Sequence, residues 1–124
     1  MSTNEIASRL VELCRQGKFE EAQKELYADN AVSVEPEDAP GLTSVEGLEN
    51  IVDKGRQFQA MVEEVHSLEM SDAVVAGNYF SLSLIMDVTF KGMGRTNMDE
   101  IAVYKVDNGK VVREEFFYET KGGM

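Results

Sequence analysis

Two glutamates and the single histidine fall on strand faces that are mostly apolar. Side chains two residues apart in a β-strand point to the same face of the sheet. On that alternation, Glu100 shares a face with Met98, Ala102, Tyr104 and Val106. Glu114 shares a face with Val112, Phe116 and Tyr118, and His66 with Val62, Glu64, Leu68 and Met70. The pattern therefore predicts Glu100, Glu114 and His66 on the inner wall of a pocket.

These residue types suit proton transfer. A carboxyl group in an apolar cavity has a raised pKa, because burial disfavours its charged form. A neutral acid can then donate a hydrogen bond, while an ionised neighbour takes a proton from carbon. His66 could do either near neutral pH. We expect Glu100 and His66 to be catalytic. The alternative is that Glu100, Glu114 and His66 pair with one another or with backbone and only hold the core together.

Glu35 is a third catalytic candidate, because it lies directly before Pro36, where a short strand ends. Its side chain could hang over the mouth of the pocket, or it could be a solvated loop acid beside Glu37 and Asp38. Tyr27 could donate its hydroxyl into the pocket or simply fill the core. The residues expected to contact a ligand are Glu114, Tyr27, Tyr104, Phe116 and Tyr118.

Helical periodicity precedes strand alternation along the chain. The predicted helices cover residues 2–16, 18–27 and 45–58, and the predicted strands cover 31–35, 62–70, 74–91, 95–106 and 110–119. A capping box of Ser2 and Glu5 opens the first helix, and Thr43 or Ser44 caps the third. Three N-terminal helices followed by a strand meander predict an α+β fold, with the helices on one face of a curved antiparallel sheet. The long strand must curl, and helices across a curled sheet form a cone with an open end.

Composition limits the classes of function. The 124 residues suit one domain, over residues 1–120, with a tail at 121–124. Twelve basic and 23 acidic residues give a net charge of -11, which disfavours nucleic acid and anionic membranes as partners. One cysteine, Cys14, and one histidine cannot form a disulfide or a usual zinc site, so we expect no metal and no cofactor. The N-terminus lacks the pattern of a secretory signal, and a cytoplasmic location is expected.

Three segments carry a resemblance to a known family. They are the run Leu26-Tyr27-Ala28-Asp29-Asn30-Ala31-Val32 followed by Glu35-Pro36, the helix start near Val45-Glu46-Gly47, and the C-terminal run from Tyr104 to Val112. In these segments the chain resembles SnoaL-like and ketosteroid-isomerase-like proteins of the nuclear transport factor 2 superfamily. The resemblance implies a cone-shaped, cystatin-like α+β fold, commonly a homodimer packed through its sheet.

The resemblance also implies roles for two glutamates. The ketosteroid-isomerase pattern places its base directly before a proline, at the position of Glu35, and its protonated acid on the penultimate strand, at the position of Glu100. This chain has glutamates where that pattern has aspartates, and the helix tyrosine of the pattern has no counterpart. Both departures argue against steroid isomerisation itself.

Two functions of different class remain open. One is a cofactor-free cyclase or isomerase, in which a pocket carboxylate removes a proton next to a carbonyl. The other is a binding module or dimeric accessory protein that holds a small apolar molecule without chemistry. A homodimer is expected in either case, since the outward faces of the strands are partly apolar. The outward residues that indicate it are Tyr79, Ile85, Ile101, Val103, Val111 and Phe117.

Overall fold

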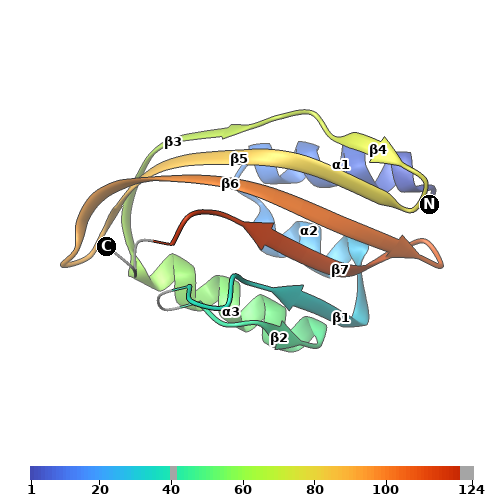
Figure 1. The fold of residues 1–124 in the computed structure, drawn as a ribbon, viewed down its shortest axis with the longest axis horizontal. Helices are drawn as coiled ribbons and strands as arrows, with labels where there is room; N and C mark the ends of the chain where they lie inside the picture. Colours follow the sequence, from blue (N-terminus) through green and yellow to red (C-terminus); the bar gives the residue numbers. More distant parts are fainter. Residues whose placement is uncertain (40–41, 121–124) are drawn as a thin grey trace.

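The computed structural model describes residues 1–39 and 42–120 and places three helices against one face of a curved sheet within them (Figure 1). The tail predicted at 121–124 lies outside the described residues. The helices are α1 (Thr3–Arg15), α2 (Phe19–Leu26) and α3 (Leu48–Met61). The strands are β1 (Tyr27–Val34), β2 (Val45–Glu46), β3 (Val62–Met70), β4 (Val74–Ala76), β5 (Tyr79–Phe90), β6 (Gly94–Asp107) and β7 (Lys110–Phe117).

The α+β fold class predicted from the sequence is confirmed, with one difference in the sheet. The strand order is β2-β1-β7-β6-β5-β3, with β4 paired to β5. All neighbours are antiparallel except β1 and β7, which run parallel and make the sheet mixed. A parallel pair needs a long crossover connection, and here most of the chain lies between the two strands. The alternation of polar and apolar residues within a strand does not indicate which distant strand it pairs with.

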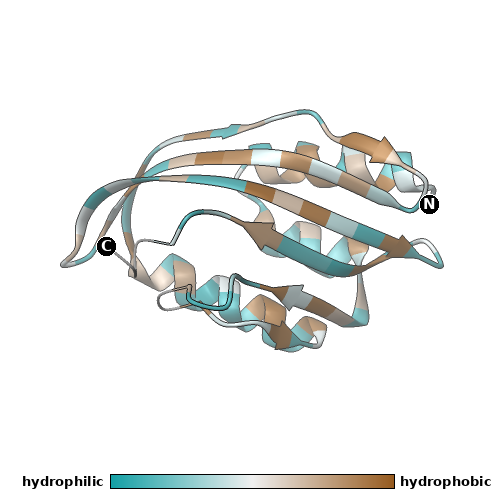
Figure 2. Ribbon diagram, in the orientation of Figure 1, coloured by the Kyte–Doolittle hydropathy of each residue, from teal (hydrophilic) through white to brown (hydrophobic). Residues whose placement is uncertain are grey.

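The inner face of the sheet and the apolar stripes of the helices form the core. The capping box of Ser2 and Glu5 opens α1, whose Ile6 and Leu10 are buried. Along β5, Phe80 and Val88 are buried as predicted. Hydrophobic and hydrophilic residues alternate along the long strands in Figure 2. No helix among residues 1–39 and 42–120 is long and apolar enough to cross a bilayer.

Three element boundaries differ from the predicted ones because of local turns. The segment predicted as one strand, 74–91, is a hairpin of β4 and β5 that turns at Gly77, where φ is 59°. The third helix begins at Leu48 and not at residue 45, because Val45 pairs with Ser33 in the sheet. Gly47 precedes this helix with a φ of 97°, a backbone conformation that favours glycine. Tyr27, predicted at the end of a helix, is the first residue of β1.

A β-bulge overturns one predicted outward position. Val111 was expected on the outer face, but it is fully buried in the core. The register of β6 and β7 shifts between Lys105 and Val106, and Val111 pairs with the buried Val106. An extra residue in a strand reverses the facing of everything beyond it. Of the other predicted outward residues, Tyr79, Ile85, Ile101 and Phe117 are exposed, and Val103 is half-buried.

Candidate functional site

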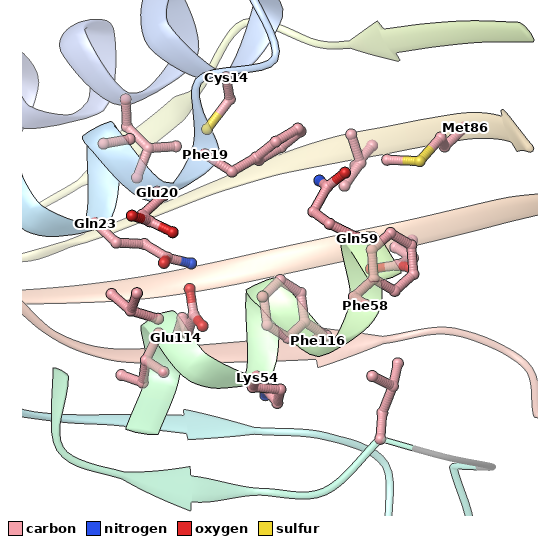
Figure 3. A pocket seen from close by; sticks show the side chains of 18 of the residues that line it. Cys14, Phe19, Glu20, Gln23, Lys54, Phe58, Gln59, Met86, Glu114 and Phe116 are labelled. Carbon is pink, nitrogen blue, oxygen red and sulfur yellow. The ribbon is translucent and has the colours of Figure 1, made fainter. Parts of the chain in front are cut away.

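A cavity of about 430 Å³ lies between the helices and the inner face of the sheet (Figure 3). Its size falls within the range of small-molecule sites, about 300–1,000 Å³. Its apolar wall includes Phe19, Phe58, Met70, Leu84, Met86, Met98 and Phe116. Its polar groups include Tyr27, Glu35, Lys54, Glu100, Tyr104 and Glu114. The cavity therefore combines an apolar body with a cluster of ionisable side chains.

Glu114, on β7, is 3 % exposed and is hydrogen-bonded from the neighbouring strand β1. Tyr27 at the start of β1 donates its hydroxyl hydrogen bond to the Glu114 carboxyl. Ser33, also on β1, acts on the same carboxyl and lowers its pKa. Burial raises the pKa of Glu114, and the effects of Ser33 and Tyr27 only partly offset that rise. Glu114 is thus an acid held in place at the floor of the cavity.

Lys54 and Glu35 form a second buried group, an ion pair. The Lys54 ammonium donates to the Glu35 Oε2 at 2.8 Å and to the Ser33 hydroxyl at 2.7 Å. Tyr118 donates to the other carboxylate oxygen of Glu35 at 2.6 Å. The side chains of Lys54 and Glu35 are 13 % and 6 % exposed. Both carboxylate oxygens of Glu35 are therefore occupied, while the ammonium of Lys54, which has three donors, keeps one donor beyond these two bonds.

Glu100, on β6, lines the cavity and has no hydrogen bond to another side chain among residues 1–39 and 42–120. It pairs across the strands with Leu84, on the inner face of β5. Burial raises its pKa to about 7, and the charges of Glu35 and Glu114 add to the rise, against the opposing effect of Lys54. Its carboxyl therefore changes charge near neutral pH.

The prediction that His66 lies on the inner wall is wrong. The register of β3 and β5 shifts between Val65 and Ser67, and the bulge turns His66 to the opposite face. There its Nε2 lies 2.7 Å from the Thr89 hydroxyl, and its Nδ1 lies 3.3 Å from Glu64. Thr89 follows the fully buried Val88 and so faces away from the helices. His66 is not among the residues that line the cavity.

The predicted ligand-contacting residues divide in two groups. Tyr27, Tyr104, Phe116 and Glu114 line the cavity. Tyr104 stacks on Phe80, with ring centroids 4.7 Å apart, which fixes its ring against the sheet. Tyr118 is not part of the cavity wall, but its hydroxyl donates a hydrogen bond to Glu35, which is. Glu35 itself lines the cavity, so it is not a solvated loop acid.

Lys54 is a buried cavity residue that sequence reasoning missed. It lies on α3 three residues after Ile51 and four before Phe58, which both line the cavity. Residues three and four apart share a helix face, so Lys54 belongs to the apolar stripe. A lysine inside such a stripe was the available signal for a buried cation. Among the described residues, no group of three or more histidine, cysteine, aspartate and glutamate side chains is arranged to hold a metal ion.

The arrangement defines a class of protein, a cone-shaped α+β domain with an acid-lined cavity under its helices. A model of the SnoaL-like domain matches residues 1–118, nearly the whole chain. A candidate SnoaL-like polyketide cyclase from Mesorhizobium loti is 35% identical in sequence, and the match covers 95% of this chain and 100% of that one, with a TM-score of 0.87. The chain therefore belongs to the SnoaL-like family.

More distant structures share the fold. An NTF2-like protein from Burkholderia thailandensis is 16% identical over 96% of this chain and 92% of its own, with a TM-score of 0.83. IdmH, a candidate polyketide cyclase from Streptomyces antibioticus, is 20% identical over 96% of this chain and 93% of its own, with a TM-score of 0.71. No curated protein matches the sequence.

Proposed function

We propose that the cavity binds a small apolar molecule and that Glu100 moves a proton at a carbon next to a carbonyl group. The observation that carries the proposal is a cavity-facing carboxyl with a pKa of about 7 and no hydrogen-bond partner among the described side chains. A general base works best when its pKa lies near the working pH. The relative from Mesorhizobium loti, named as a candidate polyketide cyclase, supports chemistry of this kind.

The groups near Glu100 in the cavity suit stabilisation of the negative charge that such a reaction forms. Removal of a proton next to a carbonyl places negative charge on the carbonyl oxygen. Lys54 keeps one ammonium donor beyond its bonds to Ser33 and Glu35, and that donor could hold the developing oxyanion. Glu35, whose two carboxylate oxygens are occupied, then serves to position Lys54. In this proposal the base is Glu100, whereas the resemblance assigns that role to the position of Glu35.

The test is exchange of protons for deuterium, which needs no knowledge of the natural substrate. A panel of apolar cyclic and aryl ketones is incubated with the protein in heavy water, and deuterium next to the carbonyl is measured by NMR. We expect exchange above the protein-free rate for at least one ketone of cavity size, increasing as pH rises through about 7. No acceleration with any of the ketones, together with a small molecule that co-purifies unchanged, would favour a binding module instead.

We also propose that the outer sheet face forms a homodimer. Tyr79, Ile85, Ile101 and Phe117 are each between 37% and 49% exposed on that face. Charged side chains of both signs, including Lys105, Arg113 and Glu115, lie among them and could pair between two copies. Light scattering should give twice the 13.8 kDa mass of one chain, and Ile101→Asp should give the single mass. A wild-type mass of one chain at high protein concentration contradicts the dimer.

A further inference from the structure

The charges around the cavity do not balance, and the imbalance bears on which ligands it accepts. Its described lining carries four carboxyl groups and two cations. Lys54 is paired with Glu35, and Arg56 of α3 is paired with Glu20 of α2 through two contacts of 2.9 Å. Both cations are thus neutralised within the protein, and the carboxyls of Glu100 and Glu114 have no cation of their own.

The two remaining carboxyls differ in how free they are to contact a ligand. Glu114 is 3 % exposed, and a hydrogen bond from Tyr27 already occupies it. Glu100 faces the cavity, and no side chain within residues 1–39 or 42–120 hydrogen-bonds to it. An ionised Glu100 therefore lacks a counter-ion from the protein. An anionic ligand would add a further negative charge to this group, whereas a cationic ligand would remove the imbalance.

The cavity that Glu100 lines also suits a cation with an apolar body. Phe58, Phe116 and Phe19 line the cavity together with several methionines (Figure 3). The faces of aromatic rings attract cations, and the gain is larger where water is excluded. The Phe116 ring already faces one cation, since Lys54 Nζ lies 5.8 Å from its centroid. Apolar side chains would cover the body of the ligand while a carboxylate holds its charge.

We propose that the cavity binds protonated amines with an apolar body, and that Glu100 is the counter-ion of the amine nitrogen. This inference goes beyond the proposed function, because it requires only the charge of Glu100 and no chemistry. Metabolites with a tertiary or quaternary ammonium group next to a ring system belong to this ligand class. Carboxylates and phosphates of the same size do not.

The proposal has a defined dependence on pH. The groups that act on Glu100 are Glu35 at the end of β1, Lys54 on α3 and Glu114 on β7. Tyr104 and Tyr118 also interact with it, and burial keeps both phenols neutral by raising their pKa values. Glu100 ionises through about pH 7, while an alkylamine, like a lysine side chain with a pKa of about 10.4, stays protonated. Affinity for amines should therefore rise with pH.

Calorimetry with benzyltrimethylammonium, benzylammonium, benzyl alcohol and benzoate tests the proposal on the intact protein. We expect both ammonium ions to bind about tenfold or more tightly than the alcohol at about pH 8.5, and benzoate to bind weakest. Lowering the pH to about 5.5 should weaken ammonium binding about tenfold and leave the alcohol unchanged. Benzyltrimethylammonium has no proton to donate, so its binding reports charge alone.

The matched variants are Glu100→Gln and Asp99→Asn. Each removes one carboxyl from β6, but Asp99 is exposed on the other face, opposite Ile85. Glu100→Gln should abolish both the ammonium preference and its pH dependence, whereas Asp99→Asn should keep both. Equal binding of alcohol and ammonium, tightest binding of benzoate, or an unchanged preference in Glu100→Gln overturns the proposal. Ammonium binding without any deuterium exchange would support this inference while contradicting the proton-transfer function.

Discussion

Replacing Glu100 by glutamine is expected to lower catalysed deuterium exchange about 10²–10⁴-fold, the usual contribution of a general base. The substitution keeps the size of the side chain and removes only the group that accepts the proton. Glu100→Asp should retain part of the activity, because the carboxyl remains but moves back from the cavity. Rates are measured by NMR in heavy water with whichever ketone the wild-type protein exchanges fastest.

The stability of the same variant separates loss of the base from loss of the fold. The pKa of Glu100 is raised in the folded protein to about 7 from its ordinary value of 4.5, so the folded state binds the proton more tightly than the unfolded state. Folding is then weakened as pH rises from about 4.5 through about 7. Glu100→Gln should therefore be more stable than wild type at about pH 8, by ~1–3 kcal/mol, and little changed at low pH. Unchanged exchange, or lower stability at about pH 8, contradicts the assigned role.

Replacing Lys54 by methionine is expected to destabilise the fold by about 3–5 kcal/mol, the usual result of breaking a buried ion pair. The variant leaves the Glu35 carboxylate, 8 % exposed as a residue, without its cation. It also removes the donor to Ser33, which is fully buried. Urea unfolding at neutral pH measures the loss in the free energy of unfolding.

Two further variants show whether the unpaired charge is the cause. Lys54→Met combined with Glu35→Gln should recover most of the lost stability, since no buried charge is then left alone. Lys24→Met removes a lysine whose pairing with Glu20 lies at the surface, and should change stability by about 1 kcal/mol or less. A loss below about 1 kcal/mol in Lys54→Met, or a double variant no more stable than the single one, contradicts a structural ion pair.

The fold and part of the site follow from periodicity in the sequence. The alternation in β5 and β6 has no bulge in its pairing, so Phe80, Val88, Glu100 and Tyr104 all face inward as predicted. A regular strand pair preserves two-residue periodicity over its whole length. Periodicity alone therefore placed Glu100, on the longest strand pair, and Glu114, on β7, correctly on the cavity wall.

The predictions fail where a β-bulge adds one residue to a strand. They also miss contacts between residues that are distant in the sequence. Bulges reversed the expected facing of His66 and Val111, and nothing in their local sequence differs from a regular strand. The contacts of Glu35 come from Lys54 and from Tyr118, which is 83 residues away along the chain. Local pattern placed Glu35 at a strand end, but only the three-dimensional fold brings a helix lysine and a C-terminal tyrosine to it.

The most direct measurement is a titration of the glutamate carboxyl carbons by NMR, in wild type and in Glu100→Gln. The account predicts that a resonance titrating at about 7 is present in wild type and is the one that Glu100→Gln removes. It is contradicted if the resonance that disappears titrates near the ordinary glutamate value of about 4.3.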